Sequence, residues 1–156
     1  MYERAIFLDI DGVLNTTESW KTPFSLNDEC VKNFCAFANR DGEGTKIILV
    51  SSWKTGWSPL AENQTQQIVD LNKKLSIHGC SIFGRTRDLG NRQKEIIDYL
   101  QNHSVDYFAI VDDDESEYKD FALGGVYLVN AESGFAASDI MRVKWKKANA
   151  HIKARL

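Results

Sequence analysis

Short apolar runs alternate along this chain with longer segments in which apolar residues recur at every third or fourth position. The runs at 5–8, 47–50, 107–111 and 126–129 have the length of buried strands, and each is followed by a polar residue. A weaker run lies at 81–83. The pattern therefore predicts four strands and a weaker fifth.

The clearest helical spacing lies at 30–38, and Ser25 and Asp28 precede it with the spacing of a capping box. The apolar stripe of this helix consists of Cys30, Val31, Phe34, Cys35, Phe37 and Ala38.

Three more helices are predicted. The first begins either at Ser58-Pro59, which suits a cap and a first-turn proline, or near Thr65. The second begins near Asn91, and Ser138 caps the third. Their apolar positions are Ile68, Leu71 and Leu75 in the first, Ile96, Ile97 and Leu100 in the second, and Ile140, Val143 and Ala148 in the third.

Near-continuous apolar strands that alternate with helices predict a doubly wound α/β fold, in which helices cover both faces of a parallel sheet. In such a sheet the carboxyl ends of the strands share one edge, where ligands bind. Polar residues directly after a strand are therefore candidate site residues. At 156 residues the chain has a common size for one domain, so we expect a single domain over residues 1–156.

Charge and composition exclude several classes of protein. The formal net charge of −3 gives no overall basic footprint for nucleic acid or anionic lipid. The apolar run before Asp9 is too short for a signal or membrane segment, so we expect a cytoplasmic protein without membrane contact. A basic C-terminus could follow a polynucleotide backbone or could form a solvated helix face; its cations are Arg142, Lys144, Lys146, Lys147, Lys153 and Arg155.

The cysteines and histidines do not predict a metal site. Cys30, Cys35 and Cys80 include no Cys-x-x-Cys pair, so we expect reduced packing residues. The histidines have no metal-ligand spacing and are expected at the surface; they are His78, His103 and His151.

Acidic and hydroxyl residues follow three of the predicted strands. Asp9-Ile10-Asp11-Gly12 follows the first, Ser51-Ser52 the second, and the run 112–114 of three aspartates the strand at 107–111. Residues i and i+2 of an extended chain point to the same side, and glycine then allows a sharp turn. Three or more carboxylates around one pocket suit a hard cation, of which Mg²⁺ is the expected one. Alternatively, the aspartates cap helices and the acidic run is a solvated turn.

These motifs resemble those of the haloacid dehalogenase superfamily in its phosphatase form. The segment 7–15 resembles the first motif, 47–51 the second and 110–113 the fourth. Within the superfamily, the Ser-Ser-Trp-Lys run at 51–54, the helix start at 92–96 and the three aspartates resemble the small capless group that includes domains of bacterial RNA-repair proteins. The resemblance implies a Rossmann-like fold of about five strands in the order 5-4-1-2-3, without a large cap domain.

The resemblance also implies the chemistry of a Mg²⁺-dependent phosphomonoester hydrolase. Asp9 would attack phosphorus to form an aspartyl phosphate, and Asp11 would act as general acid and then as general base. The carboxylates of Asp9 and Asp113 and the carbonyl of Asp11 would hold Mg²⁺, and Asp112 would assist. Ser51 would bind the phosphoryl group.

The third motif departs from the common pattern, which has a lysine at the start of a helix. Counting back from Ile96 gives Arg92, whose planar fork can bind phosphate, while Lys94 lies two residues further on. We favour Arg92, since Lys94 falls deeper in the helix. Ser51 is likewise favoured over Ser52, because it directly follows the apolar run.

Ser51 follows Asp11 by 40 positions, which leaves no room for an inserted cap. In this superfamily an open site resembles those that act on nucleic-acid ends or on a small phosphorylated molecule screened by a partner chain. Trp20, Trp53 and Trp57 fall in loops at the expected edge, where they could stack on a base or could pack against loop backbone.

Two other functions can be weighed against the phosphatase. A nucleic-acid end-processing phosphatase would use the same residues on another substrate. A non-catalytic receiver domain, in which an aspartate accepts a phosphoryl group for signalling, collects similar residues at a sheet edge. In a receiver, however, the acidic pair follows the first strand and the phosphorylated aspartate the third, which does not fit the order found here.

Overall fold

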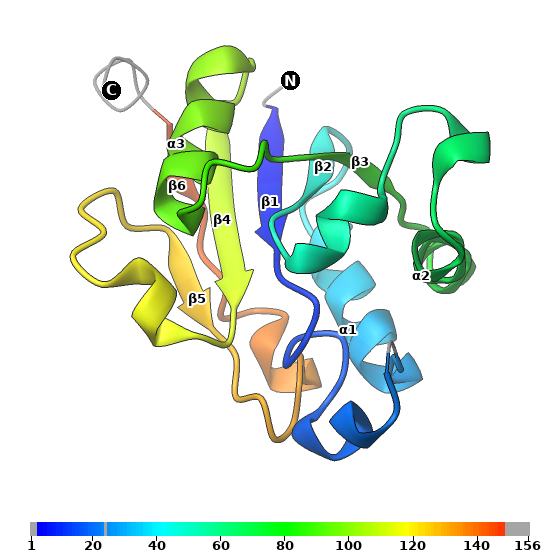
Figure 1. Cartoon of the computed structure of the whole chain (residues 1–156). Coiled ribbons are helices and arrows are strands. Elements are labelled where there is room, and N and C mark those ends of the chain that lie inside the picture. Colours follow the sequence, from blue (N-terminus) through cyan, green and yellow to red (C-terminus); the bar gives the residue numbers. More distant parts are fainter. Residues whose placement is uncertain (1–2, 24, 149–156) are drawn as a thin grey trace.

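The structure is a computed structural model, and it describes residues 3–23 and 25–148 (Figure 1). The strands are β1 (Arg4–Leu8), β2 (Thr45–Leu49), β3 (Ile82–Arg85), β4 (Tyr107–Asp112), β5 (Val126–Leu128) and β6 (Lys146–Lys147). The α-helices are α1 (Asp28–Ala38), α2 (Gln66–Ile77) and α3 (Arg92–Asn102). The 3₁₀ helices are η1 (Thr17–Lys21), η2 (Ser52–Gly56), η3 (Ala61–Asn63), η4 (Glu115–Tyr118) and η5 (Ala137–Asp139).

The sheet has the predicted order. Strands β3, β2, β1, β4 and β5 lie side by side and parallel, while β6 pairs antiparallel with the start of β4. The expected order 5-4-1-2-3 is therefore confirmed, and the carboxyl ends of β1, β2 and β4 lie at one edge. The order differs from 2-1-3-4-5, which receiver domains share with flavodoxin, and this argues against the receiver alternative.

Alternate residues of each central strand face opposite layers of helices. In β1, Ile6 and Leu8 belong to a core cluster that includes apolar residues of α1 and α2, whereas Ala5 and Phe7 belong to a cluster with residues of α3. Both faces of the sheet are thus buried, as the continuous apolar strands predict. From Ala5 to Leu8, β1 therefore carries only buried apolar side chains, and the next polar residue is Asp9.

The structure tests three predicted helix starts. The N-cap of α1 is Asn27, whose side chain accepts a hydrogen bond from the backbone N–H of Cys30, so the capping box of Ser25 and Asp28 is wrong. The helix α2 begins after Thr65, which is the later of its two expected starts. The helix α3 begins after Asn91, as predicted.

The predicted last helix is wrong over its described residues. Residues 140–148 form a turn and then β6, because long-range hydrogen bonds replace the helical ones. Arg40 donates to the carbonyls of Ile140 and Val143, and the N–H of Ala148 donates to the carbonyl of Asp106. The remainder of that prediction, with Lys153 and Arg155, lies outside the described residues.

The described residues between β1 and β2 form only η1 and α1, in agreement with the expected lack of a large cap. Within 3–23 and 25–148, no helix has both the length and the apolar character needed to cross a membrane. Cys30, Cys35 and Cys80 are buried free thiols, as predicted.

Candidate active site

The first acidic motif lies where β1 leaves the sheet. The backbone N–H of Asp9 still donates to the carbonyl of Val111 on β4, at 3.0 Å, so the chain remains extended at this residue. Two residues after Asp11 the chain has turned back, since the N–H groups of Val13 and Leu14 both donate to the carbonyl of Ile10. Asp9 and Asp11 therefore lie at the edge of the sheet, directly after the carboxyl end of β1.

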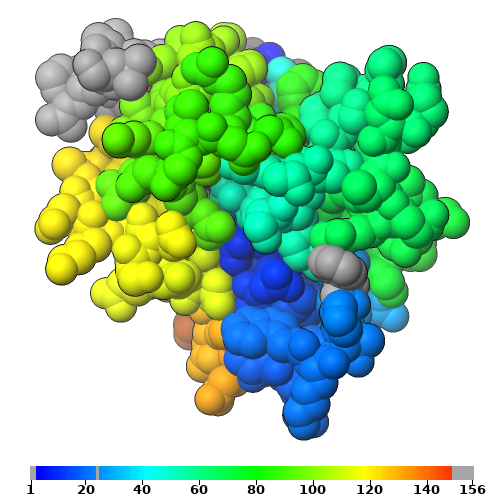
Figure 2. Space-filling view, in the orientation of Figure 1, coloured from blue at the N-terminus to red at the C-terminus, as the bar shows by residue number. Residues whose placement is uncertain are grey.

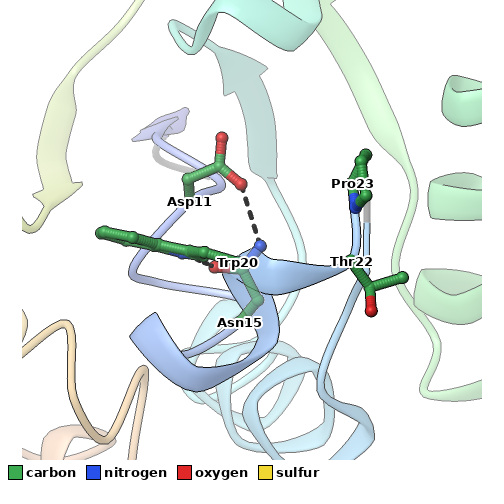
Figure 3. A pocket seen from close by; sticks show the side chains of 5 residues that line it. All are labelled: Asp11, Asn15, Trp20, Thr22 and Pro23. Atoms are coloured by element: carbon green, nitrogen blue, oxygen red, sulfur yellow. Dashed lines mark hydrogen bonds between the residues drawn. The ribbon is translucent and has the colours of Figure 1, made fainter.

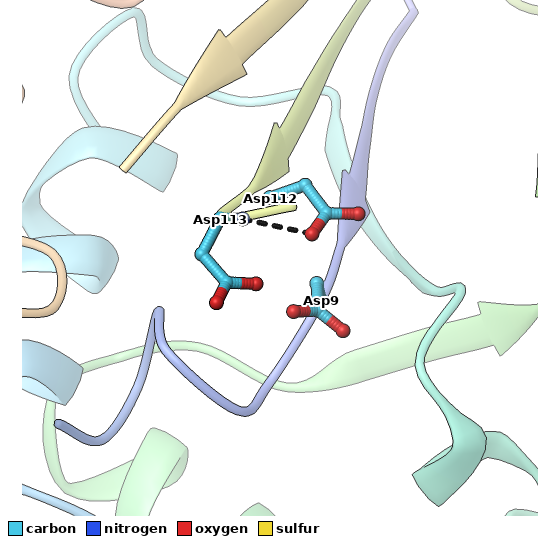
Figure 4. A group of neighbouring side chains, drawn as sticks. All are labelled: Asp9, Asp112 and Asp113. Carbon is cyan, nitrogen blue, oxygen red and sulfur yellow. Dashed lines mark hydrogen bonds between the residues drawn. The ribbon is translucent and has the colours of Figure 1, made fainter. Parts of the chain in front are cut away.

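Three carboxylates meet at this edge. Asp9, Asp112 and Asp113 each offer an oxygen that lies within 4.8 Å of the others (Figure 4). Gly12 makes this approach possible, because a Cβ at Gly12 would lie 2.3 Å from Oδ2 of Asp113. Its φ of +86° is also one that glycine adopts readily and other residues rarely do.

Asp112 is completely buried and both of its carboxylate oxygens are occupied. One oxygen accepts the backbone N–H groups of Asp113 and Asp114, at 2.8 and 3.1 Å. The other accepts from the guanidinium of Arg92 at 2.7 Å and from the hydroxyl of Tyr118 at 2.6 Å. Asp112 thus fixes the loop after β4, while the side chain of Asp113 is turned towards Asp9.

The crowding changes the acidity of these groups. Burial raises the pKa of the Asp9 carboxyl, and the charge of Asp112 raises it further, while Arg92 acts in the opposite direction. Burial, together with the charge of Asp112, also raises the pKa of Asp113. Burial alone would lower the pKa of Arg92, but the charges of Asp9 and Asp112 outweigh it and raise the pKa. The site therefore holds more negative charge than its one buried guanidinium offsets.

Asp11 is held by two side chains from different loops. One of its oxygens accepts from the amide of Asn15 at 2.9 Å, and the other from the indole N–H of Trp53 at 3.2 Å. Asn15 is buried and all four of its bonds are used, since it also accepts from the N–H of Gly12 and from the indole of Trp20 and donates to the carbonyl of Ser25. The carboxylate of Asp11 consequently has a fixed orientation.

The second and third motifs supply polar groups to the same edge. Ser51 is buried and its oxygen accepts the N–H of Trp53 at 3.1 Å, which leaves its own proton available for another acceptor. Arg92, at the start of α3, reaches Asp9 at 3.5 Å. Lys94 is exposed and borders a different pocket, with Ile97, so it is not brought to the three carboxylates.

An open pocket of about 410 Å³ lies beside the three carboxylates. Its lining residues are Asp9, Asp11, Trp20, Ser51, Ser52, Arg92, Asp113, Asp114 and Glu117. In the space-filling view, the segments that carry them meet at a hollow near the middle of the molecule (Figure 2). Of the predicted site residues, Lys94 lies elsewhere and Asp112 lies beneath the pocket rather than on its surface.

The donor set fits a hard divalent cation. Asp9 and Asp113 present carboxylate oxygens to the same space, and oxygen ligands of this kind are those that Mg²⁺ prefers. Asp112 contributes to the local charge, but its oxygens already accept four hydrogen bonds. A cation between Asp9 and Asp113 would offset the repulsion among the three neighbouring carboxylates.

Several residues that shape the site were not singled out in the sequence. Asn15 lies three residues after Gly12, a spacing typical of a local side-chain turn, which could have indicated its role. Tyr118 gives no such signal, because its contact with Asp112 depends on η4. Lys54 is also buried, where its ammonium contacts Glu95 of α3 at 2.9 Å and the hydroxyl of Thr86 at 3.1 Å.

The three loop tryptophans have separate places. Trp53 is buried against Asp11, whereas Trp57 is partly buried and packs against the core cluster on the α1 and α2 face of the sheet. Trp20 remains about half exposed, at 48%. The basic residues Lys146 and Lys147 pair with the start of β4, at the end of the strand opposite the carboxylates.

The strand order and the acidic loops define a capless domain of the haloacid dehalogenase fold. The family described as HAD domain in Swiss Army Knife RNA repair proteins matches residues 5–140, and the chain therefore belongs to that family. Searches of curated proteins and of solved structures gave no match.

Proposed function

We propose that this protein is a Mg²⁺-dependent phosphomonoester hydrolase. One observation carries the proposal: buried Asp9 and partly buried Asp113, from the ends of adjacent parallel strands, offer oxygens within 4.8 Å of each other and of Asp112. Such a cluster is costly without a cation, and it adjoins a pocket with a guanidinium and a serine hydroxyl, the groups that bind phosphate.

In this proposal Asp9 and Asp113 hold the metal with the backbone carbonyl of Asp11. When bound, Mg²⁺ would supply charge neutralisation that lets a phosphate dianion approach an acidic pocket. Arg92 and Ser51 bind the phosphoryl oxygens, and Ser52 borders them. Asp112 positions Arg92 and the loop after β4.

The reaction has two displacement steps. An oxygen of Asp9 attacks phosphorus, the bond to the leaving oxygen breaks, and Asp11 gives that oxygen its proton, so that an alcohol departs. A water molecule then attacks the phosphorus of the aspartyl phosphate, and Asp11 takes up a proton from the water. Inorganic phosphate leaves, and the carboxylate of Asp9 is restored. The bonds from Asn15 and Trp53 keep Asp11 in place for both steps.

The test is hydrolysis of 4-nitrophenyl phosphate. We expect turnover with Mg²⁺, loss of turnover in excess chelator, and a fall of at least about a thousandfold in Asp9→Asn. Asp70→Asn, which makes the same chemical change on the exposed side of α2, should keep the wild-type rate. Equal rates with Mg²⁺ and with chelator, or an unimpaired Asp9→Asn variant, would refute the mechanism.

A nucleic-acid end-processing phosphatase is the second candidate function. It is favoured by the description of the matching family, which refers to RNA repair proteins. Phosphate release from oligonucleotides with a 5′- or a 3′-phosphate, measured beside phosphorylated metabolites, distinguishes the two. A preference of about tenfold or more in kcat/KM for one oligonucleotide end would select this function.

A further inference from the structure

A second cavity adjoins the acidic pocket. It has a volume of about 390 Å³ and is lined by Asp11, Asn15, Trp20, Thr22 and Pro23 (Figure 3). Asp11 and Trp20 line the acidic pocket as well, so the two spaces share a wall. A ligand that occupies both cavities would therefore lie against Asp11.

The ring of Trp20 forms one side of this cavity. In Figure 3 the indole is seen nearly edge-on, with Asp11 and Pro23 on the same side of its plane. An indole, a proline ring and a threonine methyl make these walls largely apolar, although the neighbouring pocket is strongly acidic. The cavity is thus suited to an uncharged, flat group rather than to the phosphate.

Trp20 is held in place by a hydrogen bond rather than by burial. Its indole N–H donates to Oδ1 of Asn15 at 2.9 Å, while 48% of the residue stays exposed. Asn15 is itself 2% exposed and donates to Asp11, so the ring and the carboxylate are fixed to the same side chain. A ring oriented in advance loses little conformational entropy when a ligand stacks on it.

The geometry of phosphoryl transfer indicates where the leaving group lies relative to the second cavity. In phosphoryl transfer the attacking and leaving oxygens lie roughly in line, so the leaving group points away from Asp9. The residue proposed to protonate the leaving oxygen is Asp11, which borders the second cavity. The part of the substrate attached to that oxygen is therefore directed towards Trp20.

We infer that Trp20 is a specificity-determining residue and that the substrate is a phosphomonoester whose leaving group carries a planar ring, as a nucleoside does. The ring stacks on the indole face between Asp11 and Pro23. This inference rests on the proposed function, because it uses the role of Asp11. Stacking of a base on an aromatic side chain changes affinity by about tenfold or more when the side chain is truncated.

The kinetic test compares adenosine 5′-phosphate with ribose 5-phosphate, which share the leaving oxygen and differ by the base. With Mg²⁺, the wild type should have a kcat/KM at least about tenfold higher for the nucleotide. Trp20→Ala should abolish that preference, because it should lower kcat/KM at least about tenfold more for the nucleotide than for ribose 5-phosphate. Trp20→Phe loses the bond to Asn15 but keeps a ring, and should retain most of the preference. Phe83→Ala, which removes an exposed ring on β3, should behave as wild type.

Three results would overturn the inference. The first is a wild type without preference between the two substrates. The second is a Trp20→Ala variant that loses both activities equally, since Trp20 would then only support Asn15 and Asp11. The third is a Trp20→Phe variant that loses the preference as completely as Trp20→Ala.

A binding measurement separates this inference from the proposed function. Adenosine should quench the part of the tryptophan fluorescence that is missing in Trp20→Phe, one of four tryptophans in the chain. If the wild type hydrolyses neither 4-nitrophenyl phosphate nor these two substrates, the proposed function fails, but quenching of Trp20 fluorescence by adenosine would still support the ring site. If adenosine leaves the fluorescence of Trp20 unchanged up to millimolar concentration, the ring site fails whatever the activity.

Discussion

Single residues at the sheet edge are constrained by what faces them, and Gly12 is the clearest case. A methyl group at this position would meet the carboxylate of Asp113, and the φ of +86° would be strained as well. Gly42 has nearly the same φ, +88°, but nothing lies within 4 Å of the place of its Cβ. An alanine at Gly42 would therefore add backbone strain alone, whereas an alanine at Gly12 would add both strain and a clash with Asp113.

We expect Gly12→Ala to lower kcat/KM about a hundredfold, because it displaces Asp113 by a sizeable fraction of an ångström. Gly42→Ala should lower stability by about 1–2 kcal/mol and leave the kinetics unchanged. The measurements are the steady-state kinetics with Mg²⁺ and the urea unfolding curves of both variants. Full activity in Gly12→Ala would show that Asp113 does not need its present position.

At the scale of elements, a buried ion pair joins the second and third motifs. Lys54 of η2 and Glu95 of α3 have side chains that are only 4% and 9% exposed, and Glu95 also accepts the N–H of Leu89. The pair sets the distance between η2, which follows Ser51, and the start of α3, which carries Arg92. It therefore positions the two elements that carry Ser51 and Arg92, the residues proposed to bind phosphate, and neither Lys54 nor Glu95 lines the pocket.

Lys54→Met should destabilise the fold by about 3–5 kcal/mol, because it leaves the carboxylate of Glu95 buried without its cation. The double variant Lys54→Met, Glu95→Gln should recover part of this loss, since no uncompensated charge remains. Lys94→Met, on the exposed face of α3, is the matched control and should change stability by less than about 0.5 kcal/mol. Urea unfolding measures the stability of all three variants. Equal losses of stability in Lys54→Met and Lys94→Met would contradict a stabilising role of the buried pair.

At the scale of the whole molecule, the proposed metal site predicts that stability depends on the concentration of Mg²⁺. A cation that binds only the folded chain stabilises it by about 2.7 kcal/mol at a hundred times its Kd. For a chain of 156 residues this corresponds to a rise of roughly 5–10 °C in Tm. Without a cation, repulsion among these carboxylates should lower the stability of the folded protein.

We therefore expect Asp9→Asn to have a higher Tm than the wild type in chelator, because it removes one of three crowded charges. Added Mg²⁺ should raise the Tm of this variant by less than it raises the Tm of the wild type. Asp70→Asn should match the wild type under both conditions. Thermal unfolding followed by circular dichroism measures these shifts, and an Asp9→Asn variant with the wild-type response to Mg²⁺ would count against a shared metal site.

Local sequence determined much of this architecture. Continuous apolar runs identified the five parallel strands because both faces of the sheet are covered, and the Asp-x-Asp-Gly motif followed the first of them. The helices α2 and α3 were predicted for the same reason, since each carries an apolar stripe that packs on one face. These features depend on neighbours within a few positions.

The tertiary structure decided what depends on distant partners. Residues 140–148 do not form their predicted helix, because they bond to Arg40, which lies about 100 positions away, and to Asp106, which lies about 40 positions from Ala148. Only the folded loops show that Asp112 is saturated by Arg92 and Tyr118 while Asp113 faces Asp9. Sequence periodicity records which residues are buried, but the choice among adjacent carboxylates is made by groups brought together across the sheet.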